Sequence, residues 1–239
     1  MAIFLKANWE NIVMANYIVP QNLLLPYLPK GIEVDMFENN AYISLVGFMF
    51  KNTKLFNVPI PHFGTFEEIN LRFYVKRKNG NEYKRGVVFI NETVPFKIVA
   101  YIANKLYHES YSTVDTKHSW EYTSELKKIE YQWQVNKKWN RIYVEAKNKA
   151  NTIVKGSLEE FIYEHYYGYA KINEHETEEY KIYHPSWKIN SVLHSAISCD
   201  FKTMYGNEFE YLNQQQPQSV FIAEGSGVAI NWKRTKINT

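Results

Sequence analysis

The sequence predicts a mainly β protein of the α+β class, in which antiparallel strands form a closed or nearly closed β-barrel or double sheet with a few short helices. Aromatic residues make up 16% of the 239 residues, against only 10 glycines, and this bias favours packed strands over a Gly-rich nucleotide-binding sheet. The strand-like segments do not alternate regularly with helices, which argues against βαβ units. No Pro/Gly/Ser-rich linker interrupts the chain, so we expect a single domain over residues 1–239.

The predicted strands mix β-branched and aromatic residues with alternating polar positions, the pattern of half-buried strands. They are Trp9–Val19, Ala41–Phe50, Ile69–Lys78, Val87–Val94, Tyr111–Thr123, Ile129–Val135 and Arg141–Ala146. Turn signals separate several of them, and Asn79-Gly80 favours a tight hairpin.

Three short helices are expected between these strands. Pro20 suits the first turn of one that ends at Pro29-Lys30-Gly31, and Pro95 opens a second with Val99 and Ile102 on one face. Ser157-Leu-Glu-Glu160 is a capping box that starts the third, because the Ser hydroxyl and the Glu carboxylate each satisfy an end backbone N–H.

Composition excludes several classes of protein. There are 28 Lys plus Arg residues against 25 Asp plus Glu, a net charge of +3 without a basic arm, so no nucleic-acid partner is expected. Apolar runs such as Ile98–Ala103 are too short to cross a membrane, and residues 1–8 lack a signal-peptide core. The lone Cys199 suits a reducing cytoplasm. We therefore expect a cytoplasmic protein without a membrane partner, and a homodimer as the commonest default.

Phe66–Val75 is the most informative segment. On a strand, Glu68, Asn70, Arg72 and Tyr74 share one face, because alternate side chains point the same way. One interpretation is a solvent-facing strand with a weak Glu68–Arg72 surface pair, and spacing alone favours it, since most half-polar strands face water. The other is a polar face turned into a barrel interior, where Glu68 serves as acid or base, Arg72 holds a carboxylate, and Asn70 and Tyr74 orient a ligand.

Other reactive residue types give weaker signals. The histidines are scattered without an i, i+4 pair, so no metal site and no cofactor are expected. Gly225-Ser226-Gly227 lacks the setting of a hydrolase nucleophile or of a phosphate loop. Lys97 and Lys105 border the helix opened by Pro95, where a desolvated lysine can form a Schiff base, although a lysine extending to solvent is the commoner case.

Several segments together resemble the bacterial YqjF-like family, domain of unknown function 2071, over about Trp9 to Trp232. They are Trp9 with Asn16-Tyr17; Leu28-Pro29-x-Gly31-x-x-x-Asp35; Phe66-x-Glu68-x-Asn70-x-Arg72-x-Tyr74-Val75; Gly86-Val-Val-Phe89; Gly156-Ser-Leu-x-x-Phe161-x-x-Glu164-x-Tyr166; and His184-Pro185-x-Trp187.

The resemblance implies a fold similar to that of acetoacetate decarboxylase, with strands around a central cavity and a functional glutamate on a strand comparable to that of Glu68. This raises the interior interpretation of the polar face. The decarboxylase forms a Schiff base between a lysine, beside a second lysine, and a β-keto acid. In the corresponding region this chain has Asn104-Lys-Leu-Tyr-His108, with one lysine.

The leading hypothesis is therefore binding of a small anionic, partly apolar ligand in the barrel cavity. The catalytic candidates are Glu68, Arg72 and Lys105, and the ligand-binding candidates are Asn70, Tyr74, Tyr107 and His108. One alternative is a lyase or decarboxylase-like enzyme acting on a keto acid through a Lys105 Schiff base. The other is a non-catalytic structural or interaction protein in which an internal Glu68–Arg72 network stabilises the barrel.

Overall fold

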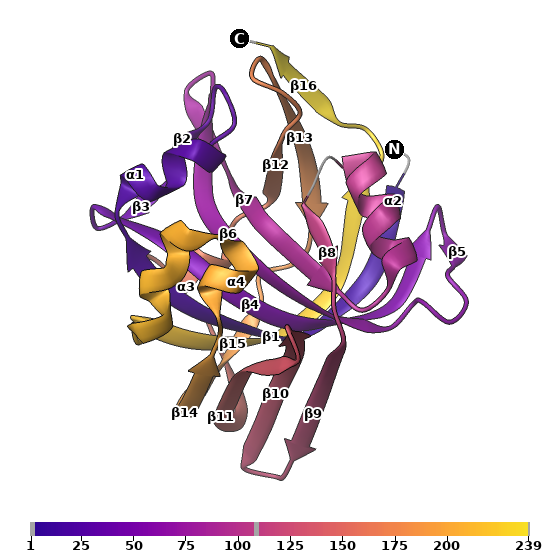
Figure 1. Cartoon of the computed structure of the whole chain (residues 1–239), viewed down its shortest axis with the longest axis vertical. Helices are drawn as coiled ribbons and strands as arrows, with labels where there is room; N and C mark the ends of the chain where they lie inside the picture. Colours follow the sequence, from indigo (N-terminus) through magenta and orange to yellow (C-terminus); the bar gives the residue numbers. More distant parts are fainter. Residues whose placement is uncertain (1–2, 108–109, 239) are drawn as a thin grey trace.

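One large sheet curls into a ring in this computed structural model, which describes residues 3–107 and 110–238 (Figure 1). Pairing of β13 with β15 closes the ring, whose remaining neighbours pair in the order β13–β12–β7–β6–β4–β1–β15. Its strands are β1 (Ile3–Val19), β4 (Asn40–Leu55), β6 (Phe66–Asn79), β7 (Glu82–Val94), β12 (Tyr167–Lys171), β13 (Glu176–Tyr183) and β15 (Ser219–Asn231).

The same sheet continues beyond the ring. From β15 it runs through β14 (Lys188–Ser198), β11 (Lys138–Thr152) and β10 (Leu126–Val135) to β9 (Thr116–Tyr122). Shorter strands add to the long ones: β2 (Glu33–Val34), β3 (Met36–Phe37), β5 (Val58–Pro59), β8 (Tyr111–Thr113) and β16 (Thr235–Asn238). The described pairings are antiparallel except where β7 meets β12 and β8, which run parallel to it. The predicted antiparallel closed or nearly closed sheet is confirmed, with these two parallel exceptions.

Helices are short and lie between strands, as the sequence predicts. The expected ones are α1 (Gln21–Leu24), which runs into a 3-10 turn at Leu25–Tyr27, α2 (Lys97–Tyr107) and α3 (Leu158–Tyr163). α3 has the predicted capping box, in which Ser157 Oγ accepts from the Glu160 N–H and Glu160 accepts from the Gly156 N–H. Two further helical segments were not predicted: α4 (Phe201–Tyr205) and the 3-10 helix Asn207–Gln214. Within the described residues, every helix is too short or too polar to cross a membrane.

The ring strands are buried on both faces, because a separate hydrophobic core packs against each face. The inner core includes Phe48 and Phe50 of β4 and Phe66 of β6. The outer core includes Leu71 and Phe73 of β6 and is covered by β10 and β11, whose buried residues include Trp133 and Ile142. Alternate residues of β6 therefore enter different cores, as the period of a strand requires.

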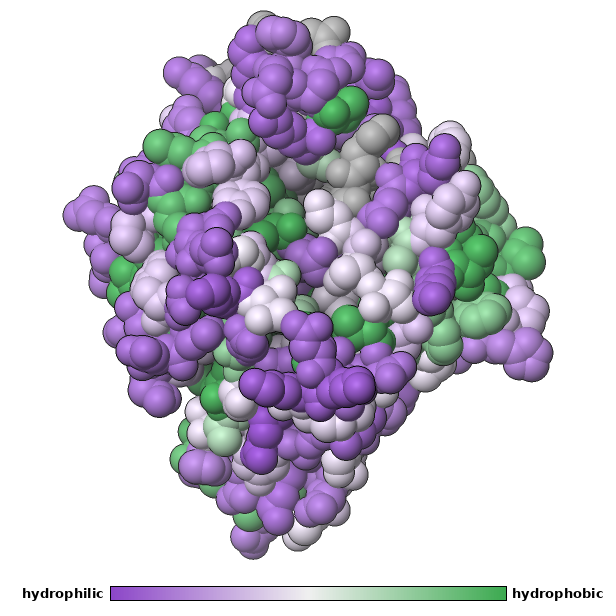
Figure 2. Space-filling view, in the orientation of Figure 1, coloured by the Kyte–Doolittle hydropathy of each residue, from purple (hydrophilic) through white to green (hydrophobic). Residues whose placement is uncertain are grey.

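Apolar side chains also reach the surface at the hairpin formed by β4 and β5. Figure 2 shows hydrophobic residues gathered there, at the right of the view. Phe56 and Val58 are 50% and 66% exposed, and the Phe56 ring lies 5.3 Å from that of Phe4 in the inner core. The interior of the ring is thus continuous with an apolar surface at this end of the molecule.

The fit of β15 against β1 yields a stability prediction. Gly225 has φ +84°, and a Cβ there would lie 2.0 Å from the carbonyl oxygen of Trp9, which cannot retreat without breaking the β1–β15 ladder. Gly80 also has a positive φ, +64°, but a Cβ there meets no atom within 4 Å. We expect Gly80→Ala to lower the free energy of unfolding by about 1 kcal/mol and Gly225→Ala by about 3 kcal/mol or more in urea titrations. Equal losses would contradict the steric explanation.

Candidate functional site

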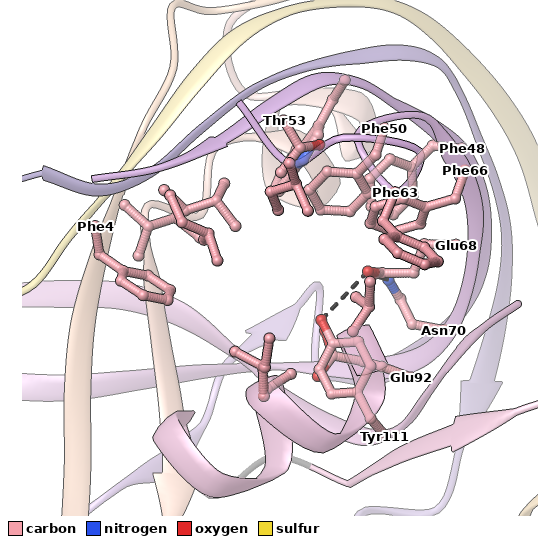
Figure 3. A pocket seen from close by; sticks show the side chains of 18 of the residues that line it. Phe4, Phe48, Phe50, Thr53, Phe63, Phe66, Glu68, Asn70, Glu92 and Tyr111 are labelled. Atoms are coloured by element: carbon pink, nitrogen blue, oxygen red, sulfur yellow. Dashed lines mark hydrogen bonds between the residues drawn. The ribbon is translucent and has the colours of Figure 1, made fainter. Parts of the chain in front are cut away.

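The ring encloses a cavity of about 140 Å³ with mainly apolar walls (Figure 3). α2 covers it with aliphatic side chains from two turns, and the strands contribute aromatic rings. The aliphatic residues of α2 are Ile98, Val99, Ile102 and Ala103, and the phenylalanine and tryptophan rings are Phe4, Trp9, Phe48, Phe50, Phe63, Phe66 and Phe89. Figure 3 shows Phe4 on one side of the space and the polar residues Glu68, Asn70, Glu92 and Tyr111 gathered on the other.

Strand β6 supplies three of the predicted site residues. Glu68, Asn70 and Arg72 all line the cavity, while the intervening Ile69 and Leu71 belong to the outer core. The polar face of this strand therefore points into the ring, which is the interior interpretation of the Phe66–Val75 pattern. The surface interpretation, which spacing alone favours, is wrong because the outer sheet β9–β11 leaves neither face of β6 open to water here.

Glu68 is a buried carboxyl group with defined hydrogen-bond donors. Its side chain is 2% exposed; Asn70 Nδ2 donates to Oε1 at 3.0 Å, and the Tyr111 hydroxyl lies 3.3 Å from Oε2. Burial raises the pKa of Glu68 to about 7, against the opposing effects of these hydrogen bonds and of the Arg72 charge. Glu68 is thus able to exchange a proton near neutral pH.

Glu92 and Tyr111 complete the polar end of the cavity, and the sequence analysis did not identify either as a site residue. The Tyr111 hydroxyl donates to Glu92 Oε1 at 2.8 Å. Tyr111 is held by Asn104 of α2, whose side-chain amide donates to the Tyr111 carbonyl oxygen at 3.0 Å and accepts from its N–H at 2.7 Å. Burial, together with the negative charges of the two glutamates, raises the pKa of Tyr111 well above its usual range, so the hydroxyl keeps its proton.

A β-bulge explains why alternation misplaces Glu92. Arg72 pairs with Phe89, but on the far side of the bulge Asn70 pairs with Glu92, so β7 uses one extra residue between these two cavity-facing positions. Regular alternation from Phe89 would instead turn Asn91 toward the cavity. The available signal was an acidic residue in the otherwise uncharged run Gly86–Val94.

Arg72 brings a positive charge to the cavity without a carboxylate partner. Among the described residues Arg72 forms no ion pair with a carboxylate, and its Nε has no hydrogen-bond partner. Nη2 makes a weak contact with Met14 Sδ at 3.5 Å, and the guanidinium also hydrogen-bonds the Tyr74 side chain. The guanidinium carbon lies 6.0 Å from the centre of the Tyr74 ring. An arginine in this setting can bind an anion by donating N–H hydrogen bonds to it.

Tyr74 lies on the predicted face of β6 but outside the cavity lining. Its ring packs against Phe161 and His165, with centroid distances of 5.3 and 4.9 Å, and its hydroxyl is 2.6 Å from Ser44 Oγ. The structure therefore does not place Tyr74 in the cavity wall, and its contact with a ligand stays a prediction. Its ring lies beneath the Arg72 guanidinium and against Phe161 of α3.

Lys105 lies in the last turn of α2 with an exposed side chain and is not among the cavity-lining residues. The residues of α2 that line the cavity are apolar, so the structure does not bring Lys105 to Glu68 and Arg72. The side chain of Tyr107 and the whole of His108, both predicted to bind ligand, lie outside the described part of the chain.

Comparison with known proteins gives a family and a fold. The model of the family DUF2071, described as an uncharacterised conserved protein, matches residues 6–227. The uncharacterised protein YqjF of Bacillus subtilis (strain 168) is 28% identical over 114 residues, which cover 47% of this chain and 46% of the relative. The match with this curated relative thus spans about half the length of each protein.

Solved structures share the fold at low sequence identity. An acetoacetate decarboxylase-like enzyme from Sphingomonas wittichii RW1 is similar over 100% of this chain and 95% of its own, with a TM-score of 0.67 and 11% identity. The enduracididine biosynthesis enzyme MppR, complexed with pyruvate, matches over 99% of this chain and 91% of its own, with a TM-score of 0.65 and 10% identity. The ring with its central cavity is therefore the fold of acetoacetate decarboxylase-like enzymes.

The raised pKa of Glu68 yields a pH-dependent stability prediction. The folded protein holds a proton that the unfolded chain releases above about pH 4.5, so the stability contributed by Glu68 is fully present below that pH and is lost as the pH rises through about 7. Glu68→Gln cannot lose this proton. Relative to wild type, the variant should gain roughly 3 kcal/mol in the free energy of unfolding between these two pH values. Urea titrations across this range provide the measurement, and a pH-independent difference would exclude the shift.

Proposed function

Because this chain belongs to the DUF2071 family and has the fold of acetoacetate decarboxylase-like enzymes, we propose that it binds a small carboxylate with an apolar body inside the ring. Arg72 holds the carboxylate group, the aromatic and aliphatic walls take the apolar body, and Glu68 exchanges a proton with the ligand. The proposal covers a substrate in an enzyme and a ligand in a binding protein, because both need this recognition.

The observation that carries the proposal is the Arg72 guanidinium, which has no carboxylate partner among the described residues. A cation in a mainly apolar cavity is unfavourable unless an anion or strong acceptors pair with it. The described contacts of Arg72 are a sulfur atom and the ring and hydroxyl side chain of Tyr74, and none of these carries the negative charge of a carboxylate. A ligand carboxylate supplies the missing charge and accepts two N–H donors from the planar guanidinium.

The walls favour a ligand that is apolar over most of its surface. Phe4 bounds the cavity on the side opposite the carboxyl groups (Figure 3), and the lining also includes Leu5, Leu55 and Ile60. Burying a methylene group against such walls contributes about 0.8 kcal/mol, so a short hydrocarbon tail adds substantially to affinity. Pyruvate, the ligand bound by the structural neighbour MppR, belongs to the same general class of small carboxylates.

Acid–base chemistry by Glu68 fits the cavity better than amine chemistry does. A buried carboxyl group with a pKa of about 7 holds and releases a proton at neutral pH, as a general acid or base must. The described cavity-lining residues include no lysine, so the alternative of a Schiff base formed by Lys105 has no geometric support. The structural alternative, an internal Glu68–Arg72 network, has less support, because the charge of Arg72 acts on Glu68 without a direct ion pair among the described residues.

Carboxylate recognition by Arg72 can be measured with simple probes. In calorimetric titrations, wild-type protein should bind hexanoate more tightly than the isosteric, uncharged hexanamide. Arg72→Met keeps the length of the side chain but removes the charge, and should weaken hexanoate binding by about 10-fold to 100-fold, as expected for a lost charge-assisted hydrogen bond.

The matched control is Lys78→Met, which removes an exposed cation further along the same strand. It should leave hexanoate affinity unchanged. If Arg72→Met binds hexanoate as well as wild type does, or if hexanamide binds equally well, Arg72 is not the carboxylate-binding residue.

Amine chemistry is tested by reductive trapping. Incubation with pyruvate or acetoacetate and borohydride, followed by mass spectrometry of peptides, should label no lysine stoichiometrically, because the described lysines lie outside the cavity lining. Stoichiometric labelling of Lys105 would favour the decarboxylase-like alternative over proton exchange by Glu68.

A further inference from the structure

We propose that Glu68, Tyr111 and Glu92 form a proton-sharing unit, through which the cavity takes up one proton from solvent whenever it binds a carboxylate. The inference rests on the proposed function, since it concerns how the same cavity accepts its anion. It adds a role for Tyr111 and Glu92, which position a proton, and it makes ligand affinity depend on pH.

The hydrogen-bond geometry around Tyr111 indicates which of the two carboxyl groups receives its proton. Its hydroxyl oxygen lies 2.8 Å from Glu92 Oε1 and 3.3 Å from Glu68 Oε2. A hydroxyl has one proton to donate, so it serves only one of these two acceptors at a time, and the shorter contact is with Glu92. The Tyr111 oxygen then presents a lone pair to Glu68, and this contact is fully satisfied when Glu68 is protonated and donates to it.

The charges in the cavity lead to the same conclusion. Among the described lining residues, the charged groups are Glu68, Arg72 and Glu92, and the titratable phenols are Tyr111 and Tyr180 of β13. Glu68 and Glu92 share one hydroxyl, whose single proton can serve only one of these two carboxyl groups at a time. Burial in the mainly apolar cavity raises the pKa of Glu68 and so favours its protonated form. In the empty cavity Arg72 opposes this effect, because its positive charge favours the ionised form of Glu68.

Ligand binding removes that opposition. When a carboxylate pairs with Arg72, the positive charge is neutralised and a further negative charge lies near Glu68. Glu68 then takes a proton from solvent and becomes a carboxylic acid that donates to Tyr111. The ligand brings one negative charge and the proton one positive charge, so the net charge of the cavity does not change. Anion and proton therefore bind together.

Glu92 acts in this scheme as a positioning residue, which gives the first test. Glu92→Gln weakens the acceptor that holds the Tyr111 proton and frees that proton to stabilise ionised Glu68, so the pKa of Glu68 should fall by about one unit or more. An infrared pH titration of the ligand-free protein follows the carboxylic acid C=O band. We expect a band that titrates near pH 7 in wild type, is absent in Glu68→Gln, and titrates at lower pH in Glu92→Gln.

Glu67→Gln is the matched control, because Glu67 is adjacent in the sequence but its carboxylate accepts from Thr116 Oγ1 of β9 outside the cavity. The Glu68 band should be the same in this variant as in wild type. An unchanged midpoint in folded Glu92→Gln would overturn the proposal. If circular dichroism shows that Glu92→Gln is unfolded, the calorimetric test below decides.

Proton uptake is measured by titrating hexanoate into the protein in buffers of different ionisation enthalpy. With a free-protein pKa of about 7, binding should take up about 0.9 proton at pH 8 and only about 0.1 at pH 6. Glu68→Gln should bind hexanoate without uptake. Binding with no buffer dependence at pH 8 would overturn the inference and leave the proposed function standing. If wild type binds no straight-chain carboxylate from butanoate to octanoate, the proposed function fails, and with it the coupling of proton uptake to binding.

Discussion

Burial of the ring strands on both faces is the constraint on which the site depends. A strand between two hydrophobic cores normally has apolar side chains on each face. β6 obeys this on its outer face, with Ile69, Leu71 and Phe73, but places Glu68 and Asn70 in the interior. These polar groups are tolerated because hydrogen bonds link them to each other and to Tyr111, which joins β6 to β8 across β7. The inner face of β6 thus has buried, hydrogen-bonded polar groups at positions where a strand between two cores normally has apolar ones.

The alternation of polar and apolar residues along a strand predicts much of the fold and half of the polar site. It fails where a β-bulge changes the face that a residue occupies, and where partners from elsewhere in the chain bury a charged residue. Glu68, Asn70 and Arg72 could be placed on one face because β6 is regular between Phe66 and Leu71. Glu92 could not, since the bulge beside Leu71 and Arg72 changes the face of β7 that reaches the cavity. The local sequence did not predict that bulge, which is a register shift in the pairing of the two strands.

Long-range ion pairs explain why the sequence analysis did not predict strand β13. The segment Glu176–Tyr183 has too many glutamates for a buried strand, yet Glu178 and Glu179 are only 5% and 4% exposed in β13. Arg77 and Lys84 from the β6–β7 hairpin hold Glu179 at 2.9 and 2.7 Å, and these cations are about 100 residues earlier in the sequence. Charged residues of this kind resemble a surface loop until their partners are known, because a carboxylate is buried only when a partner from elsewhere in the fold stabilises it.

The division of the cavity wall between its elements decides where the chemistry lies. α2 contributes only aliphatic side chains to the lining, whereas β6, β7 and β8 bring the ionisable groups together at one end. A shared fold at about 10% identity therefore does not carry a shared reaction, because a reaction depends on which element presents the reactive group. In this ring the described groups able to bind charge or move protons all lie on the strand side. In the proposed function, a ligand therefore has its charged end toward β6 and its apolar body toward α2 and Phe4, close to Glu68, Tyr111 and Arg72.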